Sequence, residues 1–123
     1  MAKATEIDIE ARAKAGRENF LKGYNCAQSV IAAFADIYPS DDIDTLLRLS
    51  ASFGGGMGRL RMTCGAASGM FMLAGLENGS ATPGNMEART RNYALVQELA
   101  AKFKEENDSL ICAELLGMRT GKI

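Results

Sequence analysis

Apolar residues recur at helical spacing along most of this chain, and residues that begin or end helices divide the pattern into segments. Glycine, proline and capping side chains supply these divisions, and no window alternates apolar and polar residues for long enough to predict a strand. The expected helices cover residues 5–22, 26–37, 41–52, 64–77, 85–107 and 110–116. The pattern predicts an all-α fold, a compact bundle of five to six helices that forms a single domain over residues 1–123.

The expected helix over residues 64–77 carries apolar side chains on nearly every face, including Met70, Phe71 and Leu73. Because a helix of this kind is normally buried, we expect it to be the central helix of the bundle. Gly65 and Gly69 lie four residues apart and therefore share one face that has almost no side chain. Another helix, a ligand or another thiol can approach the backbone closely there.

A run of glycines precedes this central helix. Four of the five residues from Gly54 to Gly58 are glycine, and glycine permits backbone angles that are closed to other residues. We expect a loop that can wrap N–H groups around an anion, with Arg59 and Arg61 adding positive charge near Cys64. The run is neither a Walker sequence nor a dinucleotide fingerprint, because the required Lys-Ser or Lys-Thr and the preceding strand are missing. The candidate cofactor-binding residues are Gly54, Gly55, Gly56, Gly58, Arg59 and Gly65.

Each of the three cysteines lies at the expected start of a helix. Cys26 follows Asn25, Cys64 follows Thr63, and Cys112 lies three residues after Ser109. Asn, Thr and Ser are side chains that cap helix N-termini. The first turn of a helix carries unpaired N–H groups and the positive end of the helix dipole, which favour a thiolate over a thiol. The three cysteines are therefore candidates for catalytic thiols and for metal ligands.

Composition excludes several classes of function. The chain has no histidine, which excludes His-ligated haem, Cys–His zinc sites and catalytic pairs that use a histidine base. Lys and Arg number 14 against 15 Asp and Glu, so charge gives no reason to expect a nucleic-acid partner. No apolar stretch is long enough to span a bilayer, and the N-terminal residues do not have the pattern of a signal peptide. We therefore expect a cytoplasmic protein without membrane insertion, in which structural disulfides are uncommon.

Two other interpretations of the same residues stay open. The cysteines can be inert core residues, since cysteine is among the most often buried residue types. In that case the glycine loop and the start of the central helix could form a binding module for an anionic small molecule. Alternatively, the chain could have a structural or interaction role in which the Gly65 and Gly69 face packs against a second copy. A homodimer is compatible with every interpretation.

Four segments follow one another along the chain, namely Gly23-Tyr24-Asn25-Cys26-Ala27-Gln28, Phe53-Gly54-Gly55-Gly56-Met57-Gly58, Cys64-Gly65-Ala66-Ala67-Ser68-Gly69 and Cys112-Ala113-Glu114-Leu115-Leu116-Gly117. In sequence and order they resemble the C_GCAxxG_C_C family of redox-active proteins. The resemblance runs from about Phe20 to Gly117, and it implies a redox role with a prosthetic group such as an iron–sulfur cluster. It gives a class of protein and does not identify a substrate or a redox partner.

The three cysteines correspond to the first three of the four that the family has. A fourth, expected after the Cys112 segment, has no counterpart, which indicates either a naturally short member or a truncated chain. A closed four-thiolate metal site needs four ligands. Three thiolates could hold a cluster or metal with one position open or filled by another group. Alternatively, two of the three cysteines could form a reversible disulfide, with the third free. The chain could also be a family member that has lost the activity and kept the fold.

Our leading hypothesis is a small redox protein in which Cys64 is the central reactive thiolate and Cys26 and Cys112 are its partners. The chemistry is either thiol–disulfide exchange or ligation of a metal or cluster, and the sequence does not choose between them. No Cys-x-x-Cys pair is present, so a resolving thiol must come from a distant segment.

Overall fold

The computed structural model describes residues 8–117, and within that range the regular structure is helical apart from one isolated β-bridge between Thr63 and Ile111. The α-helices are α1 (Ile9–Leu21), α2 (Cys26–Phe34), α3 (Ile43–Ser50), α4 (Gly54–Met57), α5 (Gly65–Asn78), α6 (Met86–Asn107) and α7 (Cys112–Leu115). Two short 3₁₀ helices, η2 (Ala35–Ile37) and η3 (Ala51–Phe53), continue α2 and α3. The predicted all-α fold is confirmed. The beginning of the first expected helix, residues 5–7, lies outside the described residues.

Polar side chains begin four of the helices. Asp8, Asn25, Asp42 and Asn85 each accept a hydrogen bond from a backbone N–H in the first turn of the helix that follows. This bond satisfies one of the N–H groups that have no partner inside the helix. The third helix was expected to begin at residue 41 and begins two residues later, because Asp42 is its N-cap residue. The carboxylate of Asp42 accepts hydrogen bonds from both the N–H and the hydroxyl of Thr45.

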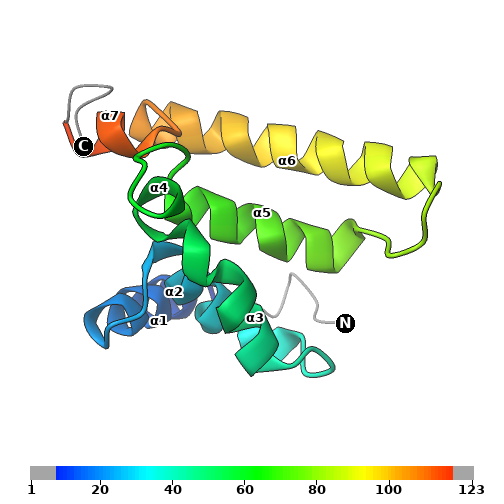
Figure 1. Cartoon of the computed structure of the whole chain (residues 1–123), viewed down its shortest axis with the longest axis horizontal. Coiled ribbons are helices and arrows are strands. Elements are labelled where there is room, and N and C mark those ends of the chain that lie inside the picture. The colour runs from blue at the N-terminus through cyan, green and yellow to red at the C-terminus, as the bar shows by residue number, and fades with distance from the viewer. Residues whose placement is uncertain (1–7, 118–123) are drawn as a thin grey trace.

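Helix α5 is the centre of the bundle, as predicted. Figure 1 shows α6 along one side of α5 and the N-terminal helices on its other side. The closest approach is to α2, where a β-carbon placed on Gly69 would lie 2.8 Å from the carbonyl oxygen of Ala27. The fully buried positions at this crossing carry small residues, such as Ala27 and Ala67, because only short side chains fit between backbones this close.

The Gly65 and Gly69 face is therefore filled by α2. This packing supports the interpretation of the two glycines as residues that permit close helix packing. It argues against the alternative interpretation in which this face packs against a second copy of the chain, because α2 already occupies it.

The glycine run forms a left-handed turn. Every residue from Gly55 to Arg59 has a positive φ, between 63° and 70°. The N–H of Gly58 donates to the carbonyl of Gly54 at 3.0 Å, which closes one helical turn of the opposite hand to the other helices. We expected a loop without helical structure here, and the hydrogen bonds correct that expectation. Left-handed backbone costs roughly 1–2 kcal/mol for each residue that carries a β-carbon, here Met57 and Arg59, so glycine is needed at most of these positions.

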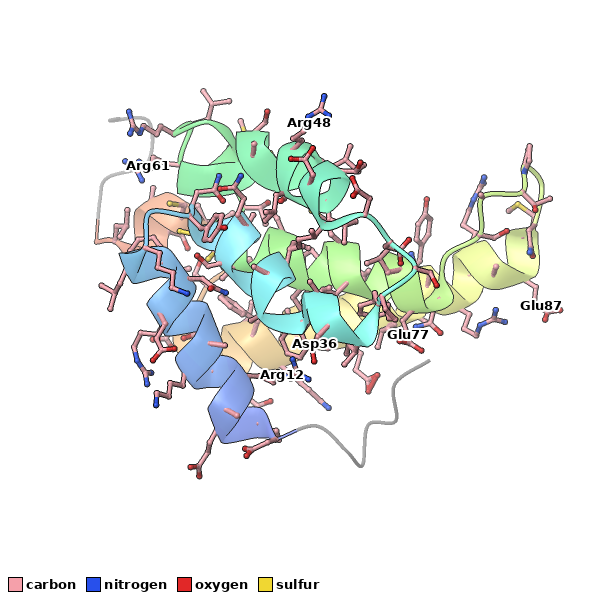
Figure 2. All side chains as sticks on the ribbon, turned by 90° about the horizontal axis from the view of Figure 1, so that it is seen from below. Arg12, Asp36, Arg48, Arg61, Glu77 and Glu87 are labelled. Atoms are coloured by element: carbon pink, nitrogen blue, oxygen red, sulfur yellow. The ribbon has the colours of Figure 1, made fainter. Side chains whose placement is uncertain are left out.

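Two further observations bear on the surface of the molecule. None of the helices within residues 8–117 is long and apolar enough to cross a membrane. In Figure 2 Arg61 lies at the end of the molecule that holds α7. The ion pair between Arg12 and Asp36 lies away from that end and joins α1 to η2. The end that holds α7 also holds the glycine turn and the starts of α2 and α5 (Figure 1).

Candidate thiol site

Cys26 is the first residue of α2 and is held there by a complete capping box. The Asn25 side chain accepts the N–H of Gln28 at 2.9 Å, and the Gln28 side chain accepts the N–H of Asn25 at 3.1 Å. The amide nitrogen of Asn25 also donates to the carbonyl of Ala51 at 2.9 Å. A β-carbon placed on Gly54 would lie 2.5 Å from the β-carbon of Asn25. One asparagine thus caps α2 and fixes it against the first residue of the glycine turn.

The start of α5 lies directly against Cys26. A β-carbon placed on Gly65 would lie 2.8 Å from the β-carbon of Cys26 and 2.9 Å from the carbonyl oxygen of Phe53. Cys64 is the residue before Gly65, so its Cα is about 3.8 Å from that of Gly65. The absence of a side chain on Gly65 therefore brings Cys26 next to the chain segment that carries Cys64.

Cys64 and Cys112 belong to two paired segments. The N–H of Cys64 donates to the carbonyl of Leu110 at 2.7 Å, and the N–H of Cys112 donates to the carbonyl of Met62 at 2.5 Å. These bonds flank the antiparallel bridge between residues 63 and 111. Residues on either side of such a bridge point to the same face, and diagonal neighbours in a regular antiparallel pair are roughly 7–8 Å apart. The pairing therefore places Cys64 and Cys112 on one face as diagonal neighbours.

Two predicted helix caps were wrong. Cys64 itself is the N-cap residue of α5, without a side-chain cap, and Thr63 is the bridge residue before it. Ile111 is the N-cap residue of α7, and the hydroxyl of Ser109 instead accepts the N–H of Ile111 and donates to Glu114. The reason in both cases is the pairing of residues 62–64 with 110–112, which local sequence does not reveal. The three cysteines still lie at helix starts, as predicted.

Cys112 is the buried thiol of the three, with 8% of its surface exposed, whereas Cys26 and Cys64 are half-buried. A β-carbon placed on Gly56 would lie 2.6 Å from the β-carbon of Cys112, so the left-handed turn packs directly on this residue. One guanidinium nitrogen of Arg61 donates to the Cys112 sulfur at 3.7 Å. We expected Arg61 to lie near Cys64, and its observed sulfur contact is with Cys112.

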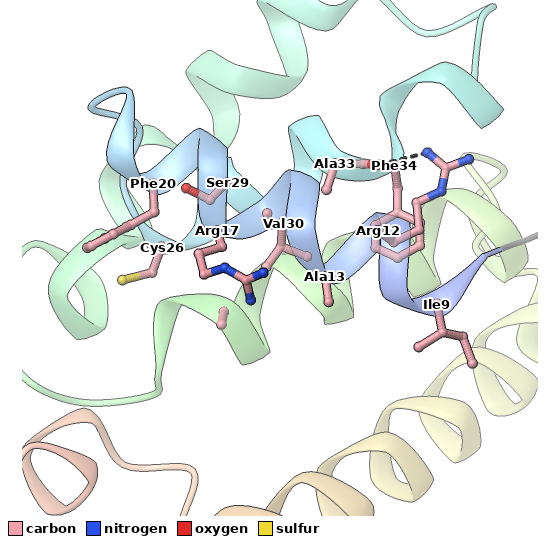
Figure 3. A pocket seen from close by; sticks show the side chains of 12 residues that line it. Ile9, Arg12, Ala13, Arg17, Phe20, Cys26, Ser29, Val30, Ala33 and Phe34 are labelled. Atoms are coloured by element: carbon pink, nitrogen blue, oxygen red, sulfur yellow. Dashed lines mark hydrogen bonds between the residues drawn. The ribbon is translucent and has the colours of Figure 1, made fainter.

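Cys26 lies between two surface hollows that share it and Phe20 as lining residues. One hollow, of about 510 Å³, is mainly apolar and runs along α1 and α2, and its lining includes Arg12 and Arg17. Figure 3 shows Phe20 and Cys26 together at one end of it and Ile9 and Arg12 at the other. The second hollow, of about 550 Å³, is the more polar of the two and is called the polar hollow below. It is lined by Phe20, Asn25, Cys26, Ala51, Gly54, Gly55, Gly58, Arg59 and Arg61. Neither lining includes Cys64 or Cys112.

The described residues do not form a ready metal centre. Within residues 8–117 no group of three or more His, Cys, Asp or Glu side chains is close enough to hold a metal ion. The donor set therefore does not fit the iron–sulfur cluster that the resemblance implies, and we derive no chemical step through a metal. Ligation of a metal by Cys26, Cys64 and Cys112 stays a prediction.

Of the candidate cofactor-binding residues, the structure gathers most at the polar hollow. Gly54, Gly55, Gly58 and Arg59 line it, whereas Gly56 is buried against Cys112 and Gly65 against Cys26. Sequence reasoning missed Phe20 and Asn25 as lining residues. Asn25 carried a usable signal, because a residue that caps the helix of a reactive thiol must lie beside it. Phe20 carried none, since only the crossing of α1 and α2 brings it to Cys26.

The fold and this site define a small all-α protein in which the chain segments that carry the three cysteines pack or pair with one another beside a left-handed glycine turn. The chain belongs to the C_GCAxxG_C_C family, whose model is described as "Putative redox-active protein (C_GCAxxG_C_C)" and matches residues 24–122. The match contains all three cysteines and the glycine turn. The comparisons found no match among curated proteins or solved structures.

Proposed function

We propose that this chain is a thiol–disulfide redox protein in which Cys26 reacts first and then forms a disulfide with Cys64. The observation that carries the proposal is the contact between Cys26 and Gly65, which brings the thiol at the surface hollows next to the segment of Cys64. The family to which the chain belongs supports the general class of redox protein.

The assignment of the first thiol rests on access. A disulfide substrate must bring one sulfur atom into line with the attacking thiolate, so the attacking residue needs open space beside it. Cys26 is half-buried and lines both hollows, whereas Cys112 is buried beneath the glycine turn. Cys64 precedes Gly65 in the chain, and the pairing of residues 62–64 with 110–112 makes it a diagonal neighbour of Cys112. We therefore propose Cys64 as the central thiol and Cys26 as the thiol that reacts first.

The reaction balances without any group beyond a disulfide substrate, RS–SR. The Cys26 thiolate attacks one sulfur, a Cys26–SR mixed disulfide forms, and the first RS⁻ leaves and takes up a proton from water. The Cys64 thiol then gives its proton to water and attacks the Cys26 sulfur, which releases the second RS⁻. Two protein thiols are oxidised to one disulfide, and one RS–SR is reduced to two RSH. The protein returns to the dithiol state when a reduced partner runs the same steps in reverse.

The test is to oxidise the reduced chain with one equivalent of a neutral disulfide and to map the product by peptide mass spectrometry. We expect a Cys26–Cys64 disulfide in the native chain and in Cys112→Ser. Cys64→Ser should stop at the Cys26 mixed disulfide, and Cys26→Ser should react slowly at every position. A chain that keeps three thiols, or that links a different pair in the native fold, would contradict the proposal.

Metal ligation is tested in the same variants. The chain is purified without oxygen, and its metal content and visible absorption are measured before and after Cys64→Ser. A bound metal or cluster that disappears in this variant would favour ligation by the three thiolates over disulfide exchange. A colourless and metal-free chain that still forms the Cys26–Cys64 disulfide would favour exchange.

A further inference from the structure

We propose that the polar hollow beside Cys26 selects a low-molecular-weight disulfide that carries negative charge, such as one with carboxylate groups. This inference rests on the proposed function, because it names the class of substrate that Cys26 would attack. It concerns the charge of the substrate and leaves the order of the thiol steps unchanged.

The charge of the lining is the first observation. Besides the thiol of Cys26, the titratable side chains that line the polar hollow are Arg59 and Arg61, and the lining includes no carboxylate. The chain as a whole carries a formal net charge of −1, so this positive site is a local feature and does not follow from composition. A hollow lined by one sign of charge raises the local concentration of ions of the opposite sign. Anionic substrates are therefore favoured beside Cys26 over neutral and cationic ones.

The glycine turn holds the two arginines in place. A β-carbon placed on Gly55 would lie 2.9 Å from Cγ of Arg59 and 3.8 Å from a guanidinium nitrogen of Arg61. Both side chains therefore lie close to the backbone of Gly55, which carries no side chain. Both residues have left-handed backbone, with φ of 68° for Arg59 and 63° for Arg61. The same guanidinium nitrogen of Arg61 donates to the Cys112 sulfur, which fixes the side chain from the other end.

The second observation is a hydrogen-bond donor of Arg61 that has no partner within the described residues. Its Nε is buried and has no hydrogen-bond partner within the described residues. A buried donor without a partner is uncommon in folded proteins, and this nitrogen is on a side chain that lines the polar hollow, so a ligand reaches it when the guanidinium turns. Arginine recognises carboxylates through two parallel N–H donors, so a carboxylate group fits this side chain by geometry as well as by charge.

The experiment compares the rates at which three disulfide probes oxidise the full reduced chain. The probes are the dianion 5,5′-dithiobis(2-nitrobenzoate), the neutral bis(2-hydroxyethyl) disulfide and the dication cystamine. Each rate is divided by the rate of the same probe with a free cysteine derivative, which removes intrinsic differences in reactivity. The variants are Arg59→Gln, Arg61→Gln and the double variant. Arg91→Gln is the matched control, because it removes the same charge from α6, where Arg91 pairs with Glu87.

We expect the corrected rate for the dianion to exceed that for the neutral probe by on the order of tenfold, and the dication to be slower than both. The preference should fall several-fold in each single variant and disappear in the double variant. It should persist in Arg91→Gln and weaken at about 0.5 M salt, where the screening length is only a few ångströms. Arg61→Lys keeps the charge and should keep most of the preference, which separates loss of charge from loss of fold.

Equal corrected rates for the three probes, or a preference that survives in the double variant, would overturn the inference. The proposed function would stand in that case, provided that the neutral probe still yields the Cys26–Cys64 disulfide. If no probe oxidises Cys26 in the native chain, both the inference and the proposed function are wrong.

Discussion

The β-carbon of Cys26 lies 2.8 Å from the point that a β-carbon on Gly65 would occupy. Real β-carbons essentially never come this close to another atom, so position 65 has no space for a side chain while α2 and α5 keep their crossing. The same contact joins the first helical residue of α2 to the first of α5. The position of Cys26 beside the segment of Cys64 therefore depends on the missing side chain at Gly65.

Gly65→Ala should destabilise the fold and separate the first two thiols. The new methyl group must push apart the starts of α2 and α5, and overpacking of this kind typically costs about 1–3 kcal/mol. The measurement is the free energy of unfolding from urea titration, together with the yield of the Cys26–Cys64 disulfide. Gly75→Ala is the control in the same helix, because a β-carbon there meets nothing within 4 Å. It should be neutral or stabilising by up to about 1 kcal/mol, and equal effects of the two variants would refute the prediction.

Gly56→Ala should cost more than Gly58→Ala. Both glycines have left-handed backbone, with φ of 70° and 63°, so both substitutions carry a similar conformational cost of roughly 1–2 kcal/mol. At Gly56 the methyl group would also lie 2.6 Å from the β-carbon of Cys112 and 2.7 Å from the nitrogen of Met62. At Gly58 the nearest atom is 3.9 Å away. Chemical denaturation should therefore show that Gly56→Ala lowers the free energy of unfolding by about 1–3 kcal/mol more than Gly58→Ala does. A smaller loss in Gly56→Ala than in Gly58→Ala would show that the turn does not pack on Cys112.

Asn25→Ala should make the first turn of α2, which carries Cys26, less stable. It removes the cap of α2, worth about 0.5–2 kcal/mol, and also the bond from the side-chain amide to Ala51. Asn25→Asp keeps an acceptor for the cap but loses the donor to Ala51, so it should recover part of the stability. Hydrogen exchange at the first turn of α2 and alkylation of Cys26 by iodoacetamide report the local effect. Asp8→Ala removes the cap of α1, and it should leave the alkylation rate of Cys26 unchanged.

The chain should lose stability at alkaline pH through Tyr38. Burial, helped by a hydrogen bond to Glu77 at 2.8 Å and by the charge of that carboxylate, raises the pKa of Tyr38 from 10.0 to about 12. Because the pKa in the folded chain is the higher one, the neutral phenol contributes stability that is complete below pH 10 and is lost as the pH rises towards 12. The difference in tyrosinate absorption between the native chain and Tyr38→Phe should have its midpoint near pH 12. Glu77→Gln should lower that midpoint, and a native midpoint near 10 would contradict the prediction.

An acidic transition should involve the pair of Asp36 and Arg12. The hydrogen bond from Arg12 holds the pKa of Asp36 below its usual value of 3.8. Because the pKa in the folded chain is the lower one, the ion pair contributes stability above pH 3.8 that is lost as the pH falls further. The difference in unfolding free energy between the native chain and Asp36→Asn should therefore shrink below that pH. A difference that is constant from pH 7 to pH 2 would show that the pair does not couple to folding.

The sequence predicted the helices well because their signals are local. Apolar spacing, the cap at Asn25 and the proline at position 39 act within a few residues, and the structure places helices there with shifts of no more than four residues at their ends. The caps that failed, at Thr63 and Ser109, lie where residues 62–64 pair with 110–112. That pairing joins segments nearly 50 residues apart, so no local signal reports it.

By itself, the sequence determined that the chain is helical, that its cysteines lie at helix starts and that the run from Gly54 to Gly58 needs backbone angles open mainly to glycine. These properties depend on side-chain type and short spacing. Only the tertiary structure decided that the Gly65 and Gly69 face receives α2, that Arg61 reaches Cys112 and that Cys26 is the thiol lining the two hollows. The physical reason is that burial and access depend on which helices cross and at what distance, and those crossings are fixed by the packing of the whole chain.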